Sequence, residues 1–153
     1  MPFRYKVLPE HRLLFGVFYG TLTAAEYMDG VDELSCDPAF EPDYDRLGIF
    51  LNGLDLSRIG LEEIRAVKER MVARYYDGTA PESLSYRIAV VSKPSVNETT
   101  LKLYAATLTA SLLSDISVKV FPDLGKALGW LGRENLVGEF RKPAWIDFMT
   151  VEH

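Results

Sequence analysis

The hydrophobic pattern of the chain changes its period several times. Short apolar runs alternate with longer segments in which apolar residues recur every three or four positions. The short runs predict strands, and the longer segments predict amphipathic helices. The predicted strands span residues 3–9, 12–22, 47–53, 84–92 and 116–122. The predicted helices begin near residues 23, 61, 95 and 123.

Polar residues mark where these helices begin. Thr23 with Glu26, and Ser95 with Glu98, have the spacing of a capping box, in which the two side chains satisfy unpaired backbone N–H groups. Asp123 is an expected N-cap residue for the last of these helices. The helix starts therefore agree with the periodicity.

The resulting element order is β-β-α-β-α-β-α-β-α. Strands that alternate with helices of this length predict an α/β fold with a single, mostly parallel sheet. The short link at Glu10 and His11 predicts that the first strand is an antiparallel edge strand. This order assigns residues 1–132 to one domain.

Residues 133–153 form an apolar C-terminal extension beyond that domain. Its large apolar residues are Leu136, Val137, Phe140, Trp145, Ile146, Phe148 and Met149. Such a composition is not typical of a disordered tail. Two alternatives remain open: the extension packs on its own domain, or it reaches a second subunit and makes a homodimer.

Composition excludes some partners. The chain has 153 residues, 48% of them hydrophobic, which suits one domain with a real core. A net charge of -5 argues against nucleic-acid binding and, more weakly, against docking on anionic lipid. No apolar run approaches the roughly 20 residues of a membrane-spanning helix, and the start shows no secretory signal. With Cys36 as the one cysteine, no internal disulfide is possible, and we expect a cytoplasmic protein.

Few residues suit catalysis. The histidines are His11, in an expected hairpin link, and His153, the last residue, so a Ser–His–Asp or Cys–His arrangement is not expected. Cys36 follows a helix and has acidic neighbours, which disfavour a reactive thiolate. No glycine-rich phosphate loop occurs, and we expect no cofactor.

Acidic residues occur in two places. Glu41, Asp43 and Asp45 lie in a connector whose spacing does not match a calcium loop, so we expect a solvated acidic loop and no metal site. Glu62 and, beside it, Glu63 lie in the first turn of a helix, where acidic residues stabilise the helix dipole.

Polar residues follow two neighbouring predicted strands. In open α/β sheets, ligands bind beyond the carboxyl ends of the parallel strands, where helix N-termini converge. Arg58 and Lys93 there would suit an anion or a phosphorylated partner. The candidate binding residues are Asn52, Asp55, Ser57, Arg58, Glu62, Lys93, Ser95 and Asn97.

Three stretches resemble the STAS-like branch of the sulfate transporter and anti-sigma factor antagonist domains. They are "YKVLPEHRLLFGVFYGTLT", the turn "LGIFLNGLDLS" and the closing "VKVFPDLGKALGWLG". The resemblance covers residues 3–132. It implies a non-enzymatic module for protein–protein regulation, with a partner surface around the second helix.

The family that this chain resembles also has a phosphorylation site that this chain does not match. Regulatory members carry a phosphorylated serine or threonine at the entrance of the second helix. Here residues 60–63 are Gly-Leu-Glu-Glu, without a hydroxyl, and Ser57 lies earlier in the turn. The phosphate switch is therefore not expected.

A second function remains open beside the regulatory one. Some STAS-like relatives hold small apolar or nucleotide-like molecules between helices and sheet, which implies a carrier or sensor with a pocket near the strand ends. The aromatic residues that could line it are Tyr19, Phe50, Tyr75, Tyr76 and Tyr104. An enzyme using Asp55 and a glutamate as an acid–base pair is the third and least favoured alternative.

Overall fold

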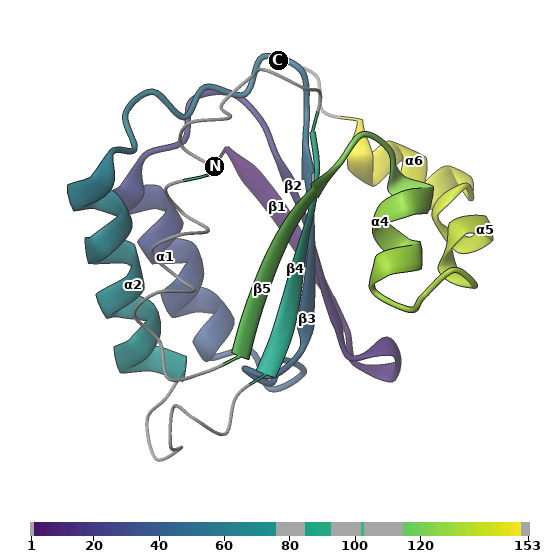
Figure 1. The fold of residues 1–153 in the computed structure, drawn as a ribbon, viewed down its shortest axis with the longest axis horizontal. Coiled ribbons are helices and arrows are strands. Elements are labelled where there is room, and N and C mark those ends of the chain that lie inside the picture. The colour runs from purple at the N-terminus through teal and green to yellow at the C-terminus, as the bar shows by residue number, and fades with distance from the viewer. Residues whose placement is uncertain (1, 76–84, 93–101, 103–114, 151–153) are drawn as a thin grey trace.

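A computed structural model describes residues 2–75, 85–92, 102 and 115–150. The chain folds into one five-stranded sheet with helices on both faces (Figure 1). The strands are β1 (Phe3–Leu8), β2 (Leu13–Phe18), β3 (Asp45–Phe50), β4 (Ser85–Val91) and β5 (Asp115–Phe121). The helices are α1 (Ala24–Ser35), α2 (Leu61–Tyr75), α4 (Leu124–Trp130), α5 (Leu136–Phe140) and α6 (Pro143–Met149), and a 3-10 turn, η1 (Pro9–His11), joins β1 to β2.

The strands lie side by side in sequence order, β1-β2-β3-β4-β5. β1 pairs antiparallel with β2, in the register Phe3 opposite Phe18, and the other neighbouring pairs are parallel. The predicted α/β class and the mostly parallel sheet with an antiparallel N-terminal edge are confirmed. Of the helix predicted from Ser95 onward, only Lys102 is among the described residues, and it is helical.

Three strand boundaries differ from the prediction by two or more residues. β2 ends at Phe18, four residues before the predicted end, and Gly20 then takes a left-handed φ of 66°, which favours glycine and turns the chain. β3 begins at Asp45, two residues before its predicted start, and ends at Phe50, three residues before its predicted end. The sequence of β3 opens on two charged residues, Asp45 and Arg46, which local pattern assigns to a polar connector.

Helix capping follows the predictions closely. The Thr23 hydroxyl accepts from the backbone N–H of Glu26, and the hydroxyl also bonds the Glu26 carboxylate at 2.8 Å. The Asp123 carboxylate accepts from the N–H of Lys126 at 2.8 Å. These contacts explain why α1 and α4 begin where they do.

The two faces of the sheet pack against different helices. α1 and α2 cover one face, and α4, α5 and α6 cover the other (Figure 1). Because strand side chains alternate, odd-numbered residues of β2 and β3 face the C-terminal helices, and even-numbered ones face α1 and α2. Phe15 and Leu47, both odd-numbered, belong to the core beneath α4, α5 and α6.

An ion-pair cluster joins α1 to α2. The Asp32 carboxylate accepts from Arg70 at 2.6 Å and from Arg74 at 2.9 Å. Burial alone would raise the pKa of Asp32, but the hydrogen bonds and charges of the two arginines outweigh it and lower the pKa below its ordinary value. The cluster therefore ties together the two helices above the sheet.

The C-terminal extension lies on the sheet of its own chain. Phe140 of α5 is 1% exposed and stacks on Phe15 with ring centroids 4.8 Å apart. Trp145 of α6 contacts both rings edge-on, at 5.6 Å and 5.0 Å. The homodimer alternative stays a prediction.

Arg133 fixes the chain between α4 and α5 to the amino-terminal ends of β2 and β3. Its guanidinium donates to the Asp45 carboxylate at 2.6 Å and to the carbonyls of His11, Arg12 and Leu131. Arg87 of β4 approaches the same carboxylate at 3.4 Å. Asp45, predicted to lie in a solvated acidic loop, is instead held within this cluster, with its side chain only 12% exposed.

None of the helices among the described residues is long and apolar enough to cross a membrane.

Candidate functional site

The predicted binding turn at residues 52–62 is a compact joint between β3 and α2. The Asp55 carboxylate accepts from the N–H of Ser57 at 2.8 Å, and Asp55 pairs through its backbone with Thr21. Hydrogen bonds from Ser57, with a smaller contribution from the charge of Arg58, lower the pKa of Asp55 below its ordinary value. Ser57 therefore stabilises the turn.

The start of α2 is held in the same way. The Glu63 carboxylate accepts from the N–H of Gly60 at 3.0 Å, and the carbonyl of Gly60 accepts from Ile64. Leu56, 4% exposed, anchors the turn in the core. The predicted helix start near residue 61 agrees with this geometry.

Only part of the predicted strand-end site can be placed. Asn52, Ser57, Arg58 and Glu62 are exposed around this joint. Lys93, Ser95 and Asn97, the residues predicted to meet them from the next strand, lie outside the described residues. Whether the two groups converge therefore stays a prediction.

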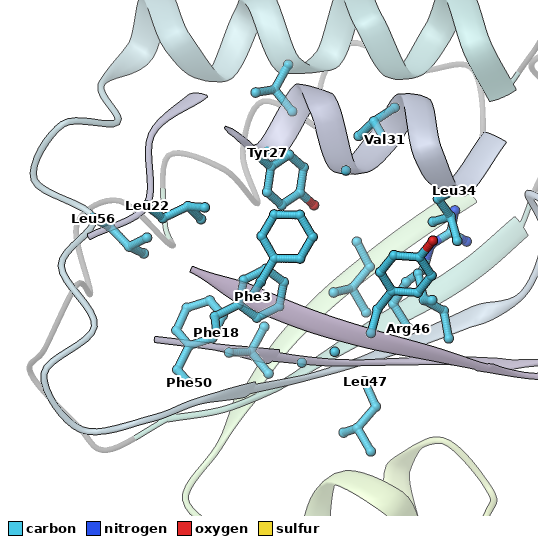
Figure 2. Close-up of a pocket in the computed structure, with 18 of the residues that line it drawn as sticks. Phe3, Phe18, Leu22, Tyr27, Val31, Leu34, Arg46, Leu47, Phe50 and Leu56 are labelled. Atoms are coloured by element: carbon cyan, nitrogen blue, oxygen red, sulfur yellow. The ribbon is translucent and has the colours of Figure 1, made fainter. Parts of the chain in front are cut away.

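A pocket of about 170 Å³ lies between the sheet and the helix pair α1–α2 (Figure 2). Its lining is almost entirely apolar and comes from both layers. β1, β2, β3 and β4 contribute, among others, Phe3, Leu14, Phe18, Phe50, Ile88 and Val90. α1, α2 and the connecting loops contribute Leu22, Tyr27, Val31, Leu34, Leu56, Ile59, Ile64, Val67 and Met71.

Two glycines form the floor of the pocket. Gly16 and Gly48 are partners in the parallel register of β2 and β3, so both lack side chains at one point of the sheet. The Phe18 ring lies across them, and a Cβ placed on Gly16 or Gly48 would be 3.2 Å or 3.4 Å from it. Glycine inside a strand often marks a place where a ligand or another backbone comes close.

Aromatic rings surround one half of the pocket. The Phe18 ring lies 5.8 Å from Phe3, 6.4 Å from Tyr27 and 5.4 Å from Phe50. Gly30 of α1 allows Phe3 to fit beneath the helix, since a Cβ there would lie 2.4 Å from the Phe3 ring. This half of the pocket is therefore rigid and closely built.

A guanidinium lies at the other end. Arg46 contacts the Tyr86 ring at 3.6 Å from its centroid, and its Nη1 donates to the carbonyls of Pro42 and Tyr44. Figure 2 shows Arg46 beside Leu34, at the end of the pocket away from Leu22 and Leu56. Arg46 therefore marks one end of the pocket, and Leu22 and Leu56 mark the other (Figure 2).

Little of this pocket could be predicted from the sequence. Among the aromatic residues predicted to line one, Phe50 does so, whereas Tyr19 is not among the described lining residues. The side chains of Tyr75, Tyr76 and Tyr104 lie outside the part of the chain that the structure describes. The missed signal is the pair of mid-strand glycines, Gly16 and Gly48.

Tyr5 lies at the pocket with its ring in the lining and its hydroxyl bonded to Glu33. The hydroxyl donates to the Glu33 carboxylate at 3.2 Å. Partial burial and the charge of Glu33 raise the pKa of Tyr5 to about 12, so the phenol stays neutral at physiological pH. Tyr5 therefore presents an uncharged ring to the pocket.

No group of three or more histidine, cysteine, aspartate or glutamate side chains within the described ranges is placed to hold a metal ion. Cys36 is exposed after α1.

The STAS-like resemblance stays a prediction, because comparison with known protein families, curated proteins and solved structures finds no match to this chain.

Proposed function

We propose that this protein is a non-enzymatic carrier or sensor that binds a small apolar ligand between its sheet and the helices α1 and α2. The observation that carries the proposal is the pocket of about 170 Å³. An engineered apolar cavity of about 150 Å³ binds benzene, so this pocket is large enough for a ligand.

The chemistry of the lining supports an apolar ligand. A water molecule in a protein interior needs two to four polar partners, which the apolar side chains of this lining do not offer. At about 24 cal/mol per Å³, filling about 170 Å³ with apolar atoms is worth up to about 4 kcal/mol. That free energy corresponds to a dissociation constant of about 1 mM, and good contacts would tighten it.

The proposal predicts that filling the pocket from within prevents binding. Val31 of α1 points into the pocket (Figure 2), and Val31→Phe should occupy the ligand's space while keeping the fold. Decan-1-ol should raise the Tm of the unmodified protein and leave the Tm of Val31→Phe unchanged. Native mass spectrometry of protein from its own cells should show a bound small molecule that the variant lacks.

A matched control makes the same change elsewhere. Val120 of β5 is 45% exposed and is not among the described lining residues, so Val120→Phe should bind as before. Gly48→Ala is a milder second variant, because its Cβ would lie at an ordinary 3.4 Å from Phe18. Equal binding by Val31→Phe and the unmodified protein would exclude this pocket as the site.

Protein–protein regulation is the second candidate function. One observation favours it: Leu61, at the start of α2, is 41% exposed beside the exposed Glu62. Leu61 and Glu62 together would offer a partner one apolar contact and one negative charge. This surface is the one that the STAS-like resemblance implies.

The regulatory function predicts a partner that depends on the start of α2. In pull-downs with tagged protein, Glu62→Arg should lose the partner that the unmodified protein retains. Glu69→Arg is the matched control, with the same charge reversal at an exposed position of the same helix. A partner lost equally in both variants, or in neither, would argue against a surface at Glu62.

A further inference from the structure

Phe18 of the pocket lining lies beside a gap in the side chains of the sheet. The strand register places Phe3, Phe18 and Phe50 in one row across β1, β2 and β3. On the pocket side of β2 and β3, the next row contains Gly16 and Gly48, which are partners in the register and carry no side chains. The space above these two glycines is therefore left to a neighbouring side chain.

The Phe18 ring fills that space. Its Cε2 atom would lie 3.2 Å from a Cβ placed on Gly16 and 3.4 Å from one placed on Gly48. Both glycines are buried, whereas Phe18 keeps part of its surface exposed. The ring therefore leans along its own strand and covers the backbone of the sheet at this point, as strand side chains tend to do.

Three other aromatic rings surround Phe18 and are themselves held in place (Figure 2). The Tyr27 ring stacks on it at an interplanar angle of 18°, and the Phe50 ring meets it edge-on at 70°. Phe3 is 8% exposed and fits against α1 only because Gly30 leaves room for its ring.

A smaller side chain at position 18 would therefore enlarge the pocket. The two glycines have nothing with which to refill the space, and the neighbouring rings are packed against other parts of the chain. Surroundings of this kind relax only partly when a large side chain is truncated, so a cavity remains. The volume lost from Phe18 would be added to the volume open to a ligand.

We propose that Phe18 determines the size of the largest ligand that the pocket accepts. This inference rests on the proposed ligand-binding function and adds the residue that sets its specificity. It predicts that the size limit moves in opposite directions when the side chain at position 18 is made smaller or larger.

The test measures the size limit with the straight-chain alcohols from hexan-1-ol to dodecan-1-ol, each below its solubility limit. Dissociation constants come from chemical-shift changes of the ¹⁵N-labelled protein, which also report weak binding. In the unmodified protein, affinity should rise about fourfold for each CH₂ group that the pocket buries, and should stop rising once the pocket is full.

Two variants at position 18 should shift that limit. In Phe18→Leu, affinity should stop rising at a chain about two to three carbons longer, because leucine has about three fewer carbons than phenylalanine and the site collapses only partly. In Phe18→Trp, the larger ring should make affinity stop rising at a shorter chain. Either variant tests the inference by itself, even where the other does not fold.

Phe15→Leu is the matched control on the same strand. Phe15 is 0% exposed, faces the C-terminal helices and is not among the described lining residues. Its truncation should lower the Tm but leave the size limit of the pocket unchanged. A general loosening of the fold would instead shift the limit in this control as well.

The outcomes separate the two proposals. If none of the alcohols binds to the unmodified protein, the ligand-binding function itself fails. If they bind but affinity rises through the whole series, or stops at the same chain length in the position-18 variants, Phe18 does not set the limit. An equal shift in Phe15→Leu and Phe18→Leu would also contradict the inference.

Discussion

Replacing Arg133 by alanine is expected to lower the free energy of unfolding by about 3 kcal/mol. The Arg133 side chain is only 17% exposed, and its guanidinium meets the Asp45 carboxylate, itself 12% exposed, at 2.6 Å. Removing the arginine leaves a largely buried carboxylate with less compensation, and it also leaves the carbonyls of His11 and Arg12 without this donor. We place the effect at the lower end of the range for buried pairs because Arg87 still approaches Asp45.

Chemical denaturation of the purified protein measures this effect. Arg141→Ala is the control, since Arg141 is exposed after α5, and its replacement should change the free energy of unfolding by no more than about 0.5 kcal/mol. A double-mutant cycle with Asp45→Asn isolates the coupling between the two side chains. Equal losses in Arg133→Ala and Arg141→Ala would mean that this cluster does not hold the C-terminal helices to the strand ends.

The second large effect is expected for Phe140→Ala, which should cost about 3–5 kcal/mol, as is typical for deleting a buried phenylalanine. Phe140 is 1% exposed, stacks on Phe15 at 4.8 Å and meets Trp145 edge-on at 5.0 Å. The substitution removes these ring contacts and opens a cavity between α5 and the sheet. Thermal unfolding followed by circular dichroism measures the loss as a lower Tm.

Ile146→Ala provides the comparison on the neighbouring helix. Ile146 of α6 is 48% exposed, so its truncation should cost less than about 1 kcal/mol. If Phe140→Ala were as mild as Ile146→Ala, residues 133–150 would not be part of the cooperative fold, and the homodimer alternative would gain weight.

Much of the fold could be predicted from the sequence because its signals are local. The spacing of apolar residues distinguished strands from helices. The hydroxyl of Thr23 and the carboxylate of Asp123 indicated where two helices start. The start of β3 was missed for a physical reason. Asp45 and Arg46 look like loop residues until their partners are known, and the partners of Asp45 lie 42 and 88 positions away, at Arg87 and Arg133.

The candidate site was less predictable than the fold. The pocket is a volume left between two layers, and no local pattern records how closely α1 and α2 approach the sheet. Gly16 and Gly48 were the available hint, but their meaning depends on a register that pairs them across two strands. Of the predicted strand-end residues, Asp55 accepts from the N–H of Ser57 within the joint, and a binding role of Asn52, Ser57, Arg58 and Glu62 stays a prediction.

The alternation of side chains along β2 and β3 has a genetic consequence. Along these strands, residues that face the pocket alternate with residues that face the C-terminal helices, as Gly16 and Phe15 do. Under the proposed function, substitutions at the first set would act mainly on which ligand is held, and substitutions at the second set mainly on stability. Neighbouring codons would then be under separate selection, so ligand preference in descendants of this chain can diverge while the support of the sheet by α5 and α6 is preserved.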